Sequence, residues 1–211
     1  MNELIRQLID QVARRRKQDD GTVTDERELE RRLREGRELV GVGGVFFVDK
    51  FACFVERMVL EDRLEGGKLF VGFELFRNMT DQPERRERYL ELDRLANSSW
   101  AYGWDEPLDY SVNPPAPWPF RRLVPVRVTR NDPVCRSWFV VYTGRDRACC
   151  LVALREVGAE SGEEAPGQPK PVRFRGIWTT DENIAEAVAA DLVRVVNPYY
   201  GVVGNRSGLS P

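Results

Sequence analysis

The sequence predicts a mixed α/β domain with one central, mixed and largely antiparallel sheet, helices that flank it, and an N-terminal helical arm. Helix-like and strand-like segments alternate in the first half of the chain, and several strand-like runs then precede a final helix, an order typical of this class. The apolar runs Trp138–Tyr142 and Ala148–Leu154 flank a short polar break with Gly144, which predicts a hairpin. Neither run alternates cleanly between apolar and polar residues, so both strands should lie in mid-sheet with both faces covered.

The size and charge of the chain exclude several classes of protein. Its 211 residues suit one domain with extensions. The 32 basic residues nearly balance the 34 acidic ones, so we expect no general nucleic-acid binding, although a local basic patch is compatible with this balance. No apolar run approaches the ~20 residues that span a bilayer, and the N-terminus is amphipathic and carries acidic residues, unlike a secretory signal. We therefore expect a cytoplasmic protein without a membrane span.

The chain contains no histidine. This excludes Ser-His-Asp and Cys-His catalysis, and it excludes metal sites with histidine ligands. We therefore expect no catalytic residues and no metal site, and the residues identify no cofactor.

The four cysteines contain no Cys-x-x-Cys pair, and the adjacent Cys149 and Cys150 should point to opposite faces of a strand. Such cysteines are mostly small apolar core residues in a reducing compartment. One alternative is a redox role for the cysteines. Another is attachment of a chromophore at Cys53, Cys149 or Cys150, which would make the chain a photosensor. Visible absorbance of the purified protein would distinguish the two.

We divide the chain into three parts. Residues 1–36 form the helical arm, residues 37–196 form a single domain with a flexible insertion at 158–171, and residues 197–211 form a loosely held tail. The insertion is rich in Gly, Glu and Pro and the tail in Gly and Ser, compositions that favour loosely ordered segments. The narrow apolar stripes of the arm suit either a solvated extension or the seam of a homodimer formed through these helices.

In the first half of the domain, apolar runs alternate with segments of helical period. The predicted elements are a strand within Glu38–Asp49, a helix Phe51–Leu64, a strand Lys68–Phe76, a loop Asn78–Gln82, a helix Glu84–Ala96 and a strand Ser99–Asp105. The glycines Gly41, Gly43 and Gly44 lack the rest of a phosphate-binding loop pattern. We expect a bulge or a close backbone approach at these glycines.

In the second half, strands follow one another. The proline-rich segment Leu108–Pro119 predicts a connector between subdomains or a partner-recognition loop. Arg121–Arg130 alternates as a strand, and Pro125 predicts that it lies at a sheet edge. After the hairpin we expect a strand Val172–Trp178 and a helix Asp181–Val196 with Thr180 as its N-cap.

Glu74 is the most unusual residue of the predicted strands. A carboxylate within such an apolar run must face solvent, pair with a cation or line a site. The aromatic row Trp100, Tyr102 and Trp104 suits a core, or the wall of a site for a planar ligand. The candidate ligand-binding residues are polar or amphipathic groups at the ends or faces of the strands: Glu74, Arg77, Tyr89, Trp104, Asp105 and Trp138.

Several short signatures follow one another along the chain. They are an acidic helix leading into a strand that ends in Gly-Phe-Glu over Glu56–Glu74, Arg88-Tyr89-Leu90, Gly103-Trp104-Asp105, Ser137–Val141 and Phe174–Thr179. Through these pieces Phe51–Val196 resembles the DICT sensory domain, a bacterial module named for its occurrence with diguanylate cyclases and two-component proteins. The resemblance implies a signalling role without catalysis. Glu74 departs from it, since the family carries Gln there about as often, and no cyclase, kinase or helix-turn-helix segment is recognisable.

We therefore expect a non-enzymatic sensory or regulatory module. It would bind a small molecule or another signal between the sheet and its helices, and act through a signalling protein or its own oligomerisation. One alternative is a protein–protein adaptor or assembly subunit that uses the arm and the proline-rich loop as contacts. Another is an enzyme in which Glu74 and Asp105 form an acid–base pair.

Deleting Met1–Gly36 distinguishes the sensor from the adaptor. An adaptor without its arm should lose its partner in a pull-down, whereas a sensory domain should keep its ligand because the pocket lies in residues 37–196. Loss of ligand binding in a deletion variant that remains folded would contradict this division of the chain.

Overall fold

The structure is a computed structural model that describes residues 7, 39–61, 63, 65–104, 118–129, 132–145, 147–155 and 173–203. The predicted arm (apart from residue 7), Asp105, most of the proline-rich segment, the insertion and residues 204–211 of the tail lie outside the described residues. The elements are, in order, β1 (Leu39–Gly44), α3 (Val45–Glu61), β2 (Lys68–Leu75), α4 (Arg77–Thr80), α5 (Pro83–Leu95), β3 (Ser98–Trp104), β4 (Leu123–Arg127), the 3-10 helix η1 (Pro133–Arg136), β5 (Ser137–Thr143), β6 (Ala148–Arg155), β7 (Arg173–Thr179) and α6 (Glu182–Val203).

The described strands form one seven-stranded sheet in the order β1-β7-β6-β5-β2-β3-β4. The pairs β2–β3 and β3–β4 are parallel, and the other neighbouring pairs are antiparallel. The predicted hairpin is confirmed: β5 and β6 pair from Thr143↔Ala148 to Ser137↔Leu154 and occupy the middle of the sheet. The predicted mixed α/β class with a largely antiparallel sheet is therefore confirmed.

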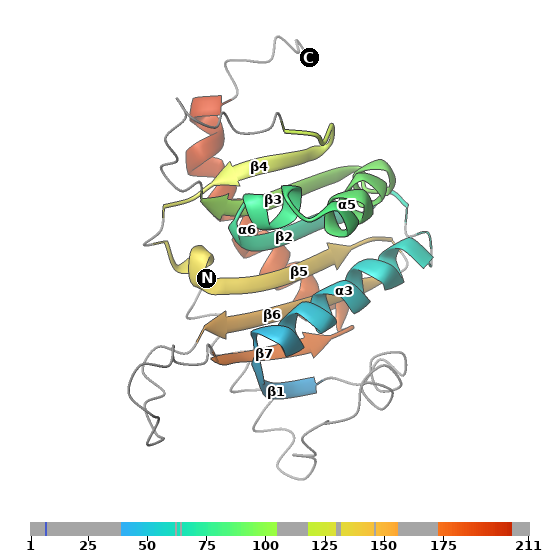
Figure 1. Cartoon of the computed structure of the whole chain (residues 1–211), viewed down its shortest axis with the longest axis vertical. Helices are drawn as coiled ribbons and strands as arrows, with labels where there is room; N and C mark the ends of the chain where they lie inside the picture. Colours follow the sequence, from blue (N-terminus) through green and yellow to red (C-terminus); the bar gives the residue numbers. More distant parts are fainter. Residues whose placement is uncertain are drawn as a thin grey trace.

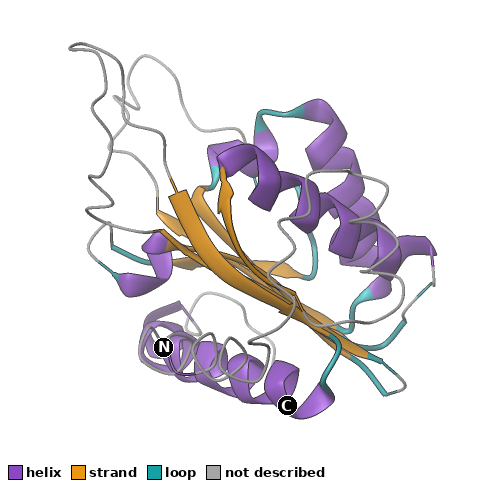
Figure 2. Cartoon of the chain, turned by 90° about the horizontal axis from the view of Figure 1, so that it is seen from below, coloured by secondary structure: helices purple, strands orange, loops and turns teal. Residues whose placement is uncertain are grey.

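Helices cover both faces of the sheet, with α3 and α5 on one face and α6 on the other (Figures 1 and 2). Adjacent residues of β6 belong to different core layers, since Cys149 packs with the α3–α5 side and Cys150 with the α6 side. Trp100 and Tyr102 of β3 pack on the α6 side, where the hydroxyl of Tyr102 donates to the carbonyl oxygen of Leu192 over 3.0 Å. Within the described part of the chain, no helix has the length and apolar character to cross a membrane.

Element boundaries differ from the sequence prediction at several places. Helix α3 begins at Val45 rather than Phe51, because the apolar run after Gly44 fits a helix as well as a strand. The predicted loop Asn78–Gln82 instead begins within the short helix α4, which runs from Arg77 to Thr80.

The last helix also begins and ends elsewhere. Its cap is Asp181 rather than Thr180, since Oδ1 of Asp181 accepts from the backbone N–H groups of Asn183 (2.9 Å) and Ile184 (3.2 Å). The helix continues to Val203 instead of ending at Val196. Pro198 lies within this range.

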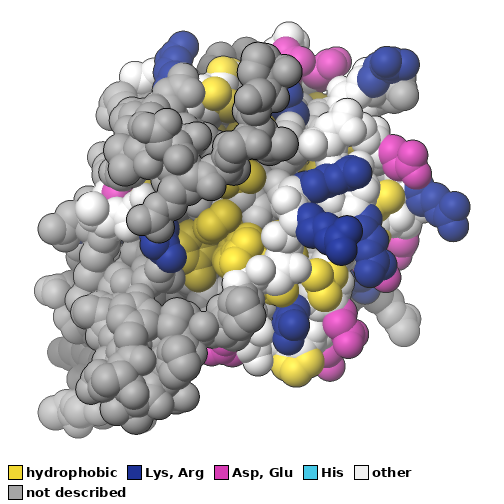
Figure 3. Space-filling view, turned by 90° about the horizontal axis from the view of Figure 1, so that it is seen from above, with side chains coloured by type: hydrophobic (Ala, Val, Ile, Leu, Met, Phe, Trp, Pro, Cys, Tyr) yellow, Lys and Arg dark blue, Asp and Glu magenta, His cyan; other side chains and the backbone are white. Residues whose placement is uncertain are grey.

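Strand β4 lies at one edge of the sheet, as Pro125 predicted. The buried carboxylate of Asp93 in α5 anchors its start by accepting backbone N–H groups of Arg121 (2.9 Å), Arg122 (2.7 Å) and Leu123. Arg121, Arg122 and Arg127 are exposed, and Figure 3, viewed from the β4 side, shows Lys and Arg side chains gathered on this face. Charges and a proline at an edge oppose pairing with another chain.

Gly176 of β7 pairs with Gly41 on one side and Ala153 on the other. A Cβ built at Gly176 would lie 2.5 Å from the carbonyl oxygen of Val152 and 2.9 Å from Cα of Ala153. Because these are backbone atoms, Gly176→Ala should lower the free energy of unfolding by about 1–3 kcal/mol, measured by urea denaturation. Ala190→Ser on the exposed side of α6 is the control. Unchanged stability of Gly176→Ala would contradict the close spacing of β6 and β7.

Candidate functional site

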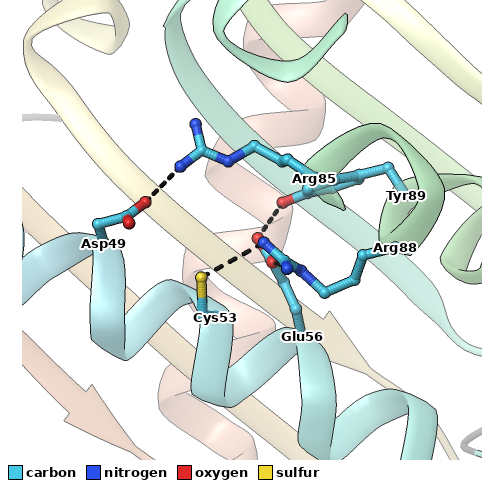
Figure 4. A network of polar contacts seen from close by, with 6 residues as sticks. All are labelled: Asp49, Cys53, Glu56, Arg85, Arg88 and Tyr89. Atoms are coloured by element: carbon cyan, nitrogen blue, oxygen red, sulfur yellow. Dashed lines mark hydrogen bonds and ion pairs between the residues drawn. The ribbon is translucent and has the colours of Figure 1, made fainter. Parts of the chain in front are cut away.

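Six polar side chains meet between α3 and α5 (Figure 4). The members of this α3–α5 network are Asp49, Cys53, Glu56, Arg85, Arg88 and Tyr89. Those on α3 recur at spacings of four and three residues, and those on α5 at spacings of three and one, so each set lies on one side of its helix. The two sets face each other on the side of the sheet opposite α6.

Glu56 is the centre of the network. Nε of Arg88 donates to Oε2 of Glu56 over 2.5 Å, and the hydroxyl of Tyr89 donates to Oε1. Nη2 of Arg88 also lies 3.3 Å from Sγ of Cys53. The Glu56 side chain is only 3% exposed, whereas that of Arg88 is 19% exposed. Both carboxylate oxygens are therefore bound by groups of α5 and almost shielded from solvent.

A second ion pair lies closer to the surface. Nη2 of Arg85 pairs with Oδ1 of Asp49, whose side chain is 34% exposed. The guanidinium of Arg85 also lies 5.9 Å from the centroid of the Phe73 ring, within the range of a cation–π contact. The network therefore runs from a partly exposed ion pair at Asp49 to a more deeply buried one at Glu56.

Burial sets the protonation behaviour of the network. Loss of hydration raises the pKa of Glu56 above its ordinary value of 4.5, although the charge of Arg88 and the hydrogen bond from Tyr89 act against this shift. Burial alone would lower the pKa of Arg88, but the Glu56 carboxylate raises it. The raised pKa of Glu56 follows from the unequal burial of the pair, since the guanidinium keeps some contact with water and the carboxylate has almost none.

The Tyr89 hydroxyl remains protonated at neutral pH. Burial, followed by the neighbouring Glu56 carboxylate, raises the pKa of Tyr89 well above 10.0. The protonated hydroxyl keeps the hydrogen that it donates to Glu56 in the network.

The net stability that the Glu56–Arg88 pair supplies is small. Two unit charges at 4 Å attract each other by about 4 kcal/mol at an effective dielectric constant near 20. Removing one ion from water costs several kcal/mol, so attraction and desolvation nearly cancel. Such a pair fixes geometry more than it adds stability, and breaking it leaves an uncompensated charge.

The structure brings four of the six sequence-predicted site residues to one end of the sheet. Glu74 lies near the end of β2, Trp104 at the end of β3, and Arg77 at the start of α4, and Leu75 is the register partner of Trp104. Strand β5 begins at the same end with Ser137-Trp138, because it runs antiparallel to β2. Asp105 and the side chains of Glu74, Arg77 and Trp104 lie outside the described residues.

The two remaining predicted residues have described side chains. Trp138 is partly buried and its ring meets that of Phe174 edge-on, with 6.2 Å between centroids. Tyr89 is fully buried, so it lies within the packing rather than on the wall of an open site. Its ring meets that of Phe73, the residue before Glu74, at 5.4 Å between centroids. Tyr89 therefore joins the α3–α5 network to the sheet end where the other candidates gather.

The sequence prediction did not include Glu56 or Arg88 among the site residues. A single acidic residue in an amphipathic helix is usually solvated, so Glu56 did not stand out. The signal was its position, four residues after Ala52 and three before Val59, both of which are buried. A carboxylate on the apolar stripe of a helix requires a partner, and Arg88-Tyr89 is the pair that supplies one.

The cysteines differ in accessibility. Burial raises the pKa of Cys149 to about 12 and raises that of Cys150 further. Cys53 is partly exposed, and burial followed by the Glu56 charge raises its pKa above 9.0. All three are therefore protonated, weakly nucleophilic thiols at neutral pH. Among the residues that the structure describes, no three Cys, Asp or Glu side chains lie together in a way that could hold a metal ion.

Comparison with known proteins found no matching family model, no matching curated protein and no matching solved structure.

A set of apolar replacements tests the energetics of the buried pair. Glu56→Leu should lower the free energy of unfolding by about 3 kcal/mol, because it leaves Arg88 without its carboxylate. The triple variant Glu56→Leu/Arg88→Met/Tyr89→Phe should return to within about 1 kcal/mol of the wild type, since no polar group is then left unpaired. Urea denaturation measures both.

Asp49→Asn is the control for the outer pair and should cost no more than about 1 kcal/mol, because Asp49 is partly solvated. If the triple variant is as unstable as Glu56→Leu alone, the pair itself stabilises the fold and the near cancellation is wrong.

Proposed function

We propose that the chain is a non-enzymatic sensory or regulatory module of the DICT type. A small ligand or another signal would bind at the end of the sheet where β2 and β3 terminate. Binding would alter the α3–α5 network, and a partner protein or a second copy of the chain would respond to the altered structure. The ligand residues in this proposal are Glu74, Arg77, Trp104, Asp105 and Trp138, with Tyr89 as the link to the network.

The observation that carries the proposal is the double contact of Tyr89. Its ring packs on Phe73 at the sheet end, and its hydroxyl donates to the buried Glu56. In sheets with parallel strands, ligands commonly bind outside the carboxyl ends of those strands. A displacement of β2 at this end would therefore reach α3 through one rigid aromatic side chain.

A second feature supports a switch over a purely structural role. The Glu56–Arg88 pair contributes little net stability but imposes a specific geometry on two helices. An arrangement in which both ions regain hydration together would therefore cost little, and a ligand that prefers this arrangement would shift the equilibrium toward it. Helix α3 directly follows β1 and the predicted arm in the chain, so its movement would alter the start of the domain.

A thermal-shift screen tests the site. The panel would contain nucleotides, cyclic dinucleotides, flavins and amino acids, added to the full chain. At least one compound should raise the melting temperature of the wild type. Glu74→Gln and Trp104→Ala should abolish that shift while keeping the unliganded melting temperature within a few degrees.

Val140→Ala is the matched control. Val140 is buried in mid-sheet on β5, so its truncation should lower the melting temperature and leave the ligand-induced shift intact. Wild-type shifts in both Glu74→Gln and Trp104→Ala would contradict the proposed site.

A further inference from the structure

The two edges of the sheet differ in how well they are protected against pairing with another chain. Strand β4 contains Pro125 and ends at the exposed Arg127, and both features oppose the addition of a further strand. The backbone groups of Leu123 are also occupied, since its N–H donates to Asp93 and its carbonyl oxygen accepts from Nε1 of Trp118 over 2.7 Å. The β4 edge is therefore a poor template for another strand.

Strand β1 lies at the opposite edge of the sheet, beside β7 (Figure 1). Its six residues, Leu-Val-Gly-Val-Gly-Gly, include no charge and no proline. Its register with β7 runs without interruption from Leu39↔Trp178 to Gly44↔Arg173, so the strand contains no bulge. Among the described strands it has a neighbour on one side only. An edge without charge, proline or bulge is a template for pairing.

The glycines of β1 strengthen this contrast. Gly41, Gly43 and Gly44 make up half of the strand. Glycine adds no side chain to the packing and loses more backbone entropy than other residues when it is ordered. A strand of this composition depends mainly on its backbone hydrogen bonds, so a second neighbouring strand would add much to its stability.

We propose that β1 pairs with β1 of a second copy of the chain, antiparallel and across a two-fold axis. Opposite residues of an antiparallel pair point to the same face of a sheet, so this axis is perpendicular to the sheet and passes beside one residue of β1. With the axis at Gly41 or at Val42, the middle of the strand, Val42 stands opposite a valine of the other copy.

The difference between the edges also determines the size of the assembly. A self-complementary contact across a two-fold axis uses the same strand of both copies and leaves two β4 edges at the ends of the joined sheet. Because the β4 edge carries Pro125 and Arg127, these ends do not pair further. The assembly therefore closes as a dimer and does not grow into a fibre.

This inference rests on the proposed sensory function for its biological meaning, because it makes a second copy of the chain the partner that responds. Helix α3 begins at Val45, directly after the last residue of β1, and carries Asp49, Cys53 and Glu56 of the α3–α5 network. The perpendicular axis places both α3 helices on the same face of the joined sheet. A movement of α3 against α5 would therefore act on the strand that forms the dimer contact.

Sedimentation equilibrium of the full chain over a dilution series tests the contact. The wild type should form a dimer of twice 24.3 kDa. Val42→Lys and Val42→Glu should each raise the dissociation constant by about tenfold or more, because like charges then face each other across the axis. An equimolar mixture of the two variants should recover association, since opposite charges then meet, and a merely unfolded variant could not recover it.

Val124→Lys is the matched control. Val124 is a half-buried valine on the opposite edge strand β4, so its replacement should leave the dissociation constant of the dimer unchanged. If the charged Val42 variants do not fold, cross-linking of Val42→Cys with a short bismaleimide takes their place. A linked dimer should form with Val42→Cys and not with Val124→Cys or the wild type.

Either of two results would overturn the proposal. One is a monomeric wild type throughout the dilution series. The other is a dimer that both charged Val42 variants leave intact, or that Val42→Cys fails to link, which would place the contact on another surface. A monomer that responds in the ligand screen would keep the sensory function and remove the second copy as its partner, whereas a β1 dimer without any ligand response would keep the contact and contradict the sensory function.

Discussion

A buried carboxylate fixes how α3 and α5 lie against each other. Apolar contacts hold both helices on the sheet, but such contacts are non-directional and tolerate small shifts. Glu56 adds a directional requirement, because its two oxygens must meet Arg88 and Tyr89 at the same time. A one-residue slip of either helix would leave a charge or a hydroxyl buried without a partner, at a cost of several kcal/mol. The register of this helix pair therefore depends on one side chain.

Both faces of the sheet are covered by apolar clusters, and they differ in their described polar contacts. On the α6 face the contacts are apolar, with one described tie between the Tyr102 hydroxyl and the Leu192 carbonyl oxygen. On the opposite face α3 and α5 belong to one apolar cluster and also carry the Glu56–Arg88 pair, in which attraction is nearly offset by desolvation. The central hairpin β5–β6, buried on both faces, provides the rigid support. Tyr89 connects the α3–α5 layer to the sheet end at which Glu74 and Trp104 lie.

The sheet could be predicted from sequence where apolar runs are long and bounded by turn residues. The hairpin around Gly144 and the edge position of β4, marked by Pro125, are both present. The start of α3 could not be predicted, because Val45–Val48 suits a strand or a helix equally and only tertiary packing decides.

Of the α3–α5 network, the sequence prediction named only Tyr89 as a site residue. Glu74 stood out because it interrupts a strand, whereas Glu56 did not because helices commonly carry acids. The pairing of Glu56 with Arg88 spans 32 residues of sequence and depends on how two helices pack, which no local pattern contains. The convergence of Glu74, Arg77 and Trp104 at one sheet end likewise follows from the parallel pairing of β2 and β3.

The most direct test of whether the α3–α5 contact is the exchangeable part of the molecule is native-state amide hydrogen exchange at fixed pH with low concentrations of denaturant. If it is, amides of α3 and α5 should exchange through an opening whose free energy lies below that of global unfolding, while β5 and β6 exchange only by global unfolding. Equal opening free energies for the helix pair and the hairpin would show a single cooperative unit and contradict the central claim.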